Sequence, residues 1–239
     1  MNRLRALIEH TLKIMRLSVV RDARANIMRR IRPRDAYLRS RSLRPISKKY
    51  GFDRGKPVDR FFIESFLEQY RNDIHGTCLE VVDDTYVRRF GGDRVMKSDA
   101  IDHFPSSHAN ILGDLRDLSG VIADNTYDCI VLTQTLNVID DYHAAIRECK
   151  RILKPGGSLL VTMPTVSPAW NLSINLWRFT ERSARFTFEQ HFPSSDLTIV
   201  PLGNRLASES FWLGMAVEDM PSEVLLANDS FPTIIGIHA

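Results

Sequence analysis

The chain has 239 residues, of which 44% are hydrophobic and 26% are charged. This composition excludes disordered and fibrous proteins and supplies enough apolar material for one sizeable folded core. No run approaches the ~18 consecutive apolar residues of a membrane-spanning helix, and no secretory signal is recognisable. The three cysteines are odd in number and lack the paired spacing of a zinc site. We therefore expect a cytoplasmic protein without a metal ion.

The net charge of +3 hides a strong asymmetry along the chain. Residues 1–60 hold 18 Lys and Arg against 5 acids, whereas residues 61–239 hold 14 against 24. We interpret residues 1–56 as a basic N-terminal arm and residues 57–239 as the globular domain. A basic segment beside an acidic body is a common means of holding an enzyme near a polyanion.

The arm begins with a pattern typical of an amphipathic helix. Its apolar residues recur at helical spacing beside basic ones, and an Arg-rich stretch interrupted by Pro33 and Pro45 follows. We expect residues 1–50 to dock peripherally on an anionic membrane, at its inner face. The alternative is that the apolar stripe packs on the protein itself or on a second subunit of a homo-oligomer. The stripe consists of Leu4, Leu7, Ile8, Leu12 and Met15.

From Phe61 onward, helix and strand signals alternate, which predicts a parallel sheet with helices on its faces. A helix is expected over residues 61–70. Four strands are expected in the first half of the domain, and the last of them, Tyr-Asp-Cys-Ile-Val-Leu-Thr, is the clearest. These strands are predicted at 77–82, 94–97, 109–112 and 127–133.

The second half of the domain opens with a helix from Tyr142 to Leu153, which Asp140 or Asp141 can cap. The segment Lys-Pro-Gly-Gly at 154–157 is expected to end that helix. The remaining predicted elements are a strand at 158–163, a helix at 184–192 capped by Thr180, a strand at 197–202, a helix at 208–220 and a closing strand at 233–238.

Two segments together resemble the class I S-adenosylmethionine-dependent methyltransferases. The run 127–136, Tyr-Asp-Cys-Ile-Val-Leu-Thr-Gln-Thr-Leu, and the run 151–161, Arg-Ile-Leu-Lys-Pro-Gly-Gly-Ser-Leu-Leu-Val, are similar to the fourth and fifth strands of that superfamily. Residues 79–92 and Trp-Arg-Phe-Thr at 177–180 are similar to a type 11-like bacterial branch linked to surface-glycan synthesis. The resemblance implies a Rossmann-like α/β fold, with a mainly parallel seven-stranded sheet and helices on both faces, and S-adenosylmethionine as cofactor.

The first motif of the family departs from its usual form in this chain. The family has a strand ending in an acid and then a glycine-rich turn, because glycine lets the backbone approach the cofactor and adopt positive φ. Glu80 matches the acid, but Val82, Asp84 and Tyr86 replace the glycines. A β-branched Val82 is poorly suited to left-handed angles, so we expect the turn to differ. Asp83 and Asp84 are expected to pair with the cofactor's ammonium group instead.

The resemblance also implies sites for the rest of the cofactor. Asp99 matches the carboxylate that holds the ribose hydroxyls, and a capping or loop role is its alternative. Asp114 matches the residue that takes the adenine amino group, with the Leu115 backbone near the ring nitrogen; its alternative is a solvated loop acid. Thr133 and Gln134 end the central strand, where open α/β sheets bind ligands.

Candidates for the acceptor side come from the chemistry of a sugar hydroxyl, which benefits from a general base. His103 is the candidate base, and an ordinary loop histidine is the alternative. Tyr86, Arg89, Trp177 and Arg178 are candidates for an acceptor wall, because aromatic faces stack on sugar rings and Arg binds phosphate or carboxylate. The alternative is that Trp177 belongs to the core and Arg178 pairs with a surface acid.

The function expected from these features is that of an S-adenosylmethionine-dependent O-methyltransferase. Its acceptor would be a hydroxyl of a saccharide or lipid-linked glycan intermediate. The alternative, suggested by the altered glycine turn, is a non-catalytic methyltransferase-like binding module. Nucleic-acid methylation is disfavoured, because neither Asn-Pro-Pro-Tyr nor Asp-Pro-Pro-Tyr follows the central strand, so no specific nucleic acid partner is expected.

Overall fold

The computed structural model of the protein describes residues 44–168, 175–226, 228 and 230–239. The chain divides into two compact units, residues 1–44 and 45–239, and the second is described below. The predicted amphipathic helix and most of the basic arm lie outside the described residues.

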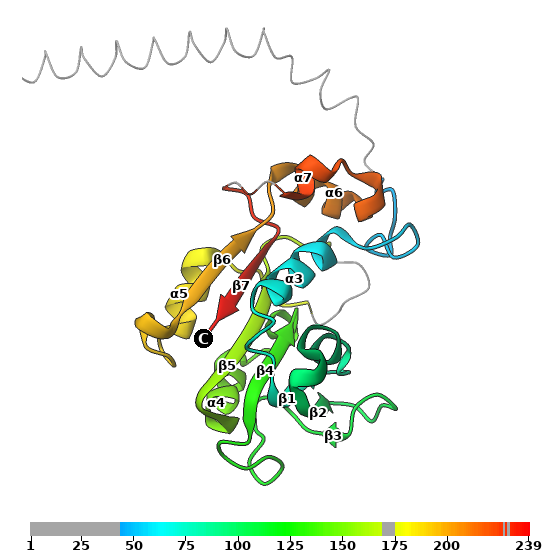
Figure 1. Ribbon diagram of the computed structural model, residues 1–239. Helices are drawn as coiled ribbons and strands as arrows, with labels where there is room; N and C mark the ends of the chain where they lie inside the picture. The colour runs from blue at the N-terminus through cyan, green and yellow to red at the C-terminus, as the bar shows by residue number, and fades with distance from the viewer. Residues whose placement is uncertain (1–43, 169–174, 227, 229) are drawn as a thin grey trace, which may run out of the picture. The chain divides into compact units, whose positions relative to one another are not determined.

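Seven strands form one sheet in the order β3-β2-β1-β4-β5-β7-β6 (Figure 1). Strands β1 to β5 pair in parallel, while β7 is antiparallel to both of its neighbours, β5 and β6. This confirms the predicted Rossmann-like, mainly parallel sheet. The strands are β1 (Gly76–Val81), β2 (Val95–Asp102), β3 (Ile111–Leu112), β4 (Tyr127–Thr133), β5 (Leu153–Pro164), β6 (Thr198–Leu202) and β7 (Ile234–His238).

Helices cover both faces of the sheet (Figure 1). The α-helices of the described residues are α3 (Val58–Gln69), α4 (Tyr142–Ile152), α5 (Glu181–Phe188), α6 (Arg205–Leu213) and α7 (Ser222–Leu226). Short helical turns are η1 (Val87–Gly91), η2 (Gly92–Arg94), η3 (Leu136–Val138), η4 (Ser194–Asp196) and η5 (Val217–Asp219).

Strand β4 is buried on both sides, as a central strand of a parallel sheet should be. Its Ile130 and Leu132 lie in one apolar cluster with α4 and α5, whereas Cys129 and Val131 lie in a second cluster with α3 and α6. This two-sided burial explains why the strand is a continuous hydrophobic run in the sequence.

Side-chain caps fix the starts of two helices on the first of these faces. The Asp141 carboxylate accepts a hydrogen bond from the Ala144 N–H at 2.9 Å, and Thr180 caps α5 in a reciprocal arrangement with Ser183. Both caps were predicted from the sequence, with Asp140 as the other candidate for the first, and both are confirmed.

Several predicted boundaries are wrong. β2 continues to Asp102 rather than ending at residue 97, and β5 begins at Leu153, so the Lys-Pro-Gly-Gly segment belongs to the strand. α5 begins at Glu181, while α6 begins at Arg205 and ends where Gly214 adopts left-handed angles, φ 71°. α7 was not predicted. A helix stop at a glycine in the left-handed region is a common C-terminal signal.

Candidate functional site

The turn after β1 is the first part of the site. Val82 follows the strand with φ 75°, and its N–H donates to the Ile101 carbonyl at 2.8 Å. The expectation that a β-branched residue here would avoid left-handed angles is wrong: the turn keeps the glycine-like conformation with valine in it. Such an angle costs about 1 to 3 kcal/mol in a non-glycine residue, and the Val82 side chain is half exposed.

Glu80 anchors the segment that follows this turn. Its buried carboxylate accepts a hydrogen bond from the Val87 N–H at 2.8 Å, at the start of η1. Burial, together with the negative charges of Asp83 and Asp84, raises the pKa of Glu80 to about 8, against the effect of the backbone hydrogen bonds. The carboxyl group is therefore largely protonated near neutral pH.

The carboxyl end of β4 forms the second part of the site. Gln134 has φ 52°, and its N–H donates to the Thr162 carbonyl at 2.9 Å. Its side-chain Nε2 is buried and has no hydrogen-bond partner among the residues that the structure describes. A buried amide without a partner is costly, so this group is available to a ligand.

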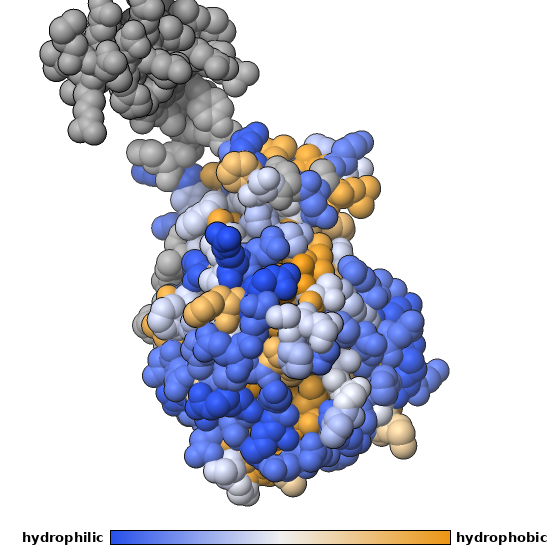
Figure 2. Space-filling model, turned by 90° about the vertical axis from the view of Figure 1, so that its left-hand side faces the viewer, coloured by the Kyte–Doolittle hydropathy of each residue, from blue (hydrophilic) through white to orange (hydrophobic). Residues whose placement is uncertain are grey.

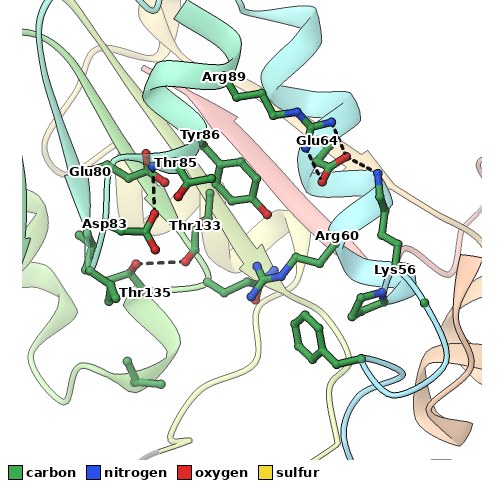
Figure 3. Close-up of a pocket in the computed structure, with 17 residues that line it drawn as sticks. Lys56, Arg60, Glu64, Glu80, Asp83, Thr85, Tyr86, Arg89, Thr133 and Thr135 are labelled. Carbon is green, nitrogen blue, oxygen red and sulfur yellow. Dashed lines mark hydrogen bonds and ion pairs between the residues drawn. The ribbon is translucent and has the colours of Figure 1, made fainter. Parts of the chain in front are cut away.

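A cavity of about 650 Å³ opens where β1 and β4 end, a size typical of small-molecule sites. Figure 3 shows the β1 turn and Thr133 on one side of it and α3 on the other, with Tyr86 between them. The cavity is lined by Phe52, Gly55, Lys56, Pro57, Arg60, Glu64, Glu80, Val81, Val82, Asp83, Thr85, Tyr86, Arg89, Thr133, Gln134, Thr135 and Val138.

The α3 side of the cavity carries three cations and one acid, which we call the basic wall: Lys56, Arg60, Arg89 and Glu64. Glu64 binds Lys56 Nζ at 2.5 Å and an Arg89 guanidinium nitrogen at 2.9 Å. Partial burial raises the pKa of Glu64, but the hydrogen bonds from Arg89 and Lys56 outweigh it and lower the pKa overall. Glu64 therefore stays ionised and neutralises only part of the wall.

The structure brings six of the predicted site residues together. Glu80, Asp83, Tyr86, Arg89, Thr133 and Gln134 all line the cavity. Asp83 also accepts a hydrogen bond from the Thr85 N–H at 2.9 Å. The neighbouring Asp84 is not part of the lining, and its carboxylate binds Arg88 Nε at 2.6 Å.

Asp99 lies within β2, opposite Leu79 of β1, and does not line the cavity. Its buried carboxylate accepts hydrogen bonds from Asn110 Nδ2 at 2.7 Å, Lys97 Nζ at 2.8 Å and Tyr127 Oη at 3.1 Å. The carboxylate at the end of the strand belongs to Asp102, which the sequence interpretation did not select.

Asp114 and His103 lie in loops outside the cavity lining. Asp114 forms an ion pair with Arg116 at 2.6 Å, and His103 Nδ1 lies 3.8 Å from the Asp114 carboxylate. The His103 side chain is 58% exposed, and the side chain of Leu115 is buried in the core. None of the three lines the cavity.

Trp177 and Arg178 are also absent from the lining. The Trp177 indole N–H donates to the Ile139 carbonyl at 2.9 Å, and the Arg178 guanidinium donates to the Ser167 carbonyl at 2.9 Å. Both residues follow segment 169–174, which lies outside the described residues.

Sequence reasoning missed the α3 side of the cavity. Lys56, Arg60 and Glu64 are spaced by four residues along the chain, which is the spacing of one helix face; Arg60 and Glu64 lie on α3, and Lys56 lies just before it. That spacing was the available signal, but the same pattern is equally typical of a solvated helix surface. Only the fold shows that this face borders the ends of β1 and β4.

The described residues contain neither a metal-ligand cluster nor a membrane-spanning helix. No group of three or more His, Cys, Asp or Glu side chains in that part of the chain is arranged to hold a metal ion. Within the same residues, no helix has both the length and the apolar character needed to cross a membrane.

Comparison with curated proteins gives short matches. A segment of 49 residues is 45% identical to the ubiquinone/menaquinone biosynthesis C-methyltransferase UbiE of Klebsiella pneumoniae (strain 342), covering 19% of this chain and 20% of that protein. Another of 55 residues is 40% identical to UbiE of Hahella chejuensis, covering 20% and 22%. The matches thus span about a fifth of the length of these relatives.

The comparison with solved structures and the comparison with protein families agree with each other. The crystal structure of a SAM-dependent methyltransferase from Archaeoglobus fulgidus superposes with a TM-score of 0.53 at 11% identity, over 75% of this chain and 93% of that one. Residues 25–198, more than half of the chain, match the family described as methyltransferase domain. The chain therefore belongs to this methyltransferase domain family.

Proposed function

We propose that the cavity over β1 and β4 holds the cofactor's methionyl end and the acceptor, and that the acceptor is a hydroxyl of a saccharide or glycan intermediate. The observation that supports this best is the composition of the lining. Aromatic rings of Tyr86 and Phe52 stand beside charged and hydroxyl groups, and such a mixture suits a sugar, which has both apolar faces and polar edges.

Three features of the described residues fit S-adenosylmethionine. Val82 keeps the backbone angle that the family obtains from glycine. The carboxylate of Asp83 lines the cavity and suits an ammonium group. The buried, unpartnered Nε2 of Gln134 offers a hydrogen bond at the end of β4. We propose that these residues hold the methionyl part of the cofactor.

When bound, S-adenosylmethionine supplies a methyl group activated by a positively charged sulfur. The chain then has to align the acceptor oxygen with that methyl group and exclude water, because positioning provides most of the acceleration in an in-line displacement. Tyr86, which projects between the β1 turn and the basic wall (Figure 3), is placed to orient the acceptor.

A second candidate is methylation of a carbon atom. It is favoured by the local identity to proteins named as C-methyltransferases. The two candidates differ in the product, because a methyl group on oxygen and one on carbon have well separated carbon chemical shifts.

The test is an assay of the full chain with methyl-labelled S-adenosylmethionine and a panel of saccharides and phenolic compounds. We expect label in an O-methylated saccharide, detected by mass spectrometry and assigned by nuclear magnetic resonance. Label on a carbon, or no transfer to any saccharide, would contradict the proposal. Calorimetry with S-adenosylhomocysteine serves as the control that the cofactor site is intact.

We propose further that residues 1–50 hold the enzyme on an anionic membrane surface, where a lipid-linked acceptor would be found. The support is the sequence alone: an apolar stripe beside basic residues, followed by an Arg-rich stretch. Packing of the stripe on a second subunit is the alternative.

A further inference from the structure

The basic wall has more positive charge than its own acid neutralises. Lys56 and Arg89 share the single carboxylate of Glu64. Arg60, one turn before Glu64 on α3, has no side-chain hydrogen bond or ion pair with any residue that the structure describes. Its backbone N–H is bound by Asp59 Oδ1 at 2.8 Å, but that carboxylate is buried and does not line the cavity.

The Tyr86 hydroxyl is a second polar group without a hydrogen bond to the described part of the chain. In Figure 3 it points toward the side of the cavity that Arg60 occupies. Partial burial raises the pKa of Tyr86, although the charge of Arg60 opposes this. The phenol therefore stays protonated at neutral pH and can donate a hydrogen bond.

The cofactor alone does not account for this wall. S-adenosylmethionine has one carboxylate, whereas Lys56, Arg60 and Arg89 carry three positive charges against the one negative charge of Glu64. One positive charge is left after the cofactor's carboxylate is matched. A cleft lined by an excess of one sign of charge attracts the opposite sign, so the remaining positive charge favours a second anion in the cavity.

We propose that the acceptor carries an oxyanion, either a phosphate or a carboxylate, and that Arg60 and Tyr86 bind it. The Arg60 guanidinium can donate hydrogen bonds to two oxygen atoms at once, and the Tyr86 hydroxyl can donate a hydrogen bond to one of them. The inference rests on the proposed transfer to a saccharide and narrows its acceptor to an acidic or phosphorylated one.

The test is calorimetry on the full chain saturated with S-adenosylhomocysteine, so that the cofactor's own carboxylate is already in place. The probes are glucose 1-phosphate, glucuronate and the uncharged methyl glucoside. We expect at least one charged probe to bind about tenfold or more tightly than methyl glucoside, the scale of a charged hydrogen bond. Comparison of the two charged probes separates phosphate from carboxylate recognition.

Arg60→Gln should abolish that preference, and Tyr86→Phe should weaken it by about threefold or more. Arg71→Gln is the matched control, since Arg71 follows the far end of α3 and pairs with Glu68 at 2.9 Å; it should leave all affinities unchanged. The Kd of S-adenosylhomocysteine, measured for each variant, shows whether the cofactor site is intact.

Three results would overturn the inference: no heat with any probe, equal affinity for charged and uncharged probes, or an Arg60→Gln variant that still binds S-adenosylhomocysteine and keeps the preference for charged probes. A different result would contradict the proposed function. If a charged probe binds through Arg60 but no saccharide is ever methylated, the oxyanion site stands and the saccharide acceptor is wrong.

Discussion

Two aspartates of β2, three residues apart, have carboxylates in different surroundings. Asp99 is buried and accepts hydrogen bonds from three donors. Asp102 ends the strand and is partly exposed, and among the described residues its carboxylate accepts only a local hydrogen bond, from the Phe104 N–H at 3.1 Å. The resemblance to methyltransferases places a ribose-binding carboxylate at the end of the second strand. By position, Asp102 is better suited to that role.

Substitutions at Asp102 and Asp99 distinguish a residue that binds the cofactor from one that stabilises the fold. Asp102→Asn should weaken S-adenosylhomocysteine binding by about 1.5 to 3 kcal/mol, the value of a hydrogen bond to a charged group. Asp99→Ala should instead lower the free energy of unfolding by about 2 to 3 kcal/mol, because it leaves buried donors unsatisfied. Calorimetry and urea unfolding measure these effects, with the exposed Asp93→Asn as control. A larger loss of cofactor affinity in a folded Asp99→Ala variant would contradict the assignment.

Glu80 predicts a pH dependence of stability. Its pKa is raised from 4.5 to about 8 in the folded protein, so between these values the folded state binds more protons than the unfolded state. Its contribution to stability is therefore complete below pH 4.5 and is lost as the pH rises through 8, with a slope of up to ~1.4 kcal/mol per pH unit.

Glu80→Gln removes this titration and keeps an acceptor for the Val87 N–H. Urea unfolding between pH 5 and pH 8 should therefore show a flatter profile for the variant than for the parent protein. Parallel profiles would mean that Glu80 is ionised in the folded state at all of these pH values.

Part of the cavity lining could be predicted from the sequence. Glu80, Asp83, Thr133 and Gln134 follow from their places at strand ends, and all four line the cavity. Asp99 matched the family's ribose-binding carboxylate because the strand was expected to stop at residue 97, which put Asp99 just beyond its end. Arg60 had no distinguishing pattern, because its importance comes from a long-range contact between α3 and the sheet.

At the scale of elements, the β1 turn is the least usual feature. A valine takes the angle that the family assigns to glycine, and the turn then leads into the π-helical η1, a rare conformation that is frequent at functional sites. The local sequence disfavours this turn, so tertiary contacts must hold it, among them the hydrogen bond between the Val82 N–H and β2.

Val82→Gly should therefore stabilise the protein by about 1 kcal/mol, because relief of backbone strain exceeds the added entropy of the unfolded chain. Val121→Gly is a matched control, since both side chains are 50% exposed and Val121 is not among the residues with positive φ. The control should be destabilised by about 0.5 to 1 kcal/mol. Equal destabilisation of both variants in thermal unfolding would show that the turn is not strained.

Element type was predicted more accurately than element boundaries. β4 was predicted with its correct bounds because its apolar residues are buried on both faces of the sheet and form one continuous run. α6 was expected too late in the chain, because Asn204 caps it through the Ala207 N–H at 2.9 Å and that cap was not recognised. Gly214 ends the helix with left-handed angles, and a Cβ added there would lie 2.3 Å from the Ser47 carbonyl oxygen.

At the scale of the whole molecule, basic residues are concentrated in the N-terminal quarter of the chain and acidic residues in the remainder. Residues 1–60 have a large excess of basic residues and the remainder an excess of acids. The acidic body alone would be repelled by an anionic membrane, so any attraction must come from the basic segment, at ~1 kcal/mol per basic residue close to the surface.

The full chain should therefore co-sediment with anionic vesicles but not with neutral ones, and should lose this binding as the salt concentration rises. A full-length variant with Arg29, Arg30, Arg32 and Arg34 changed to Gln should bind several-fold more weakly. The matched control changes four basic residues of the second unit, Arg71, Arg88, Lys150 and Arg182, to Gln. If the control loses as much binding as the first variant, the attraction is not specific to the basic arm.

The place of β7 in the sheet has a consequence for how the protein is made. β6 is complete at residue 202, yet its one strand neighbour in the described part of the chain is β7. That strand is synthesised some thirty residues later and lies between β5 and β6. A nascent chain can assemble β1 to β5 in order as it leaves the ribosome, but β6 then waits without a partner while the edge of β5 stays open. That interval exposes two unpaired edges at once, so the yield of folded protein should depend on chaperones that shield emerging chains and on the speed with which the last segment is translated.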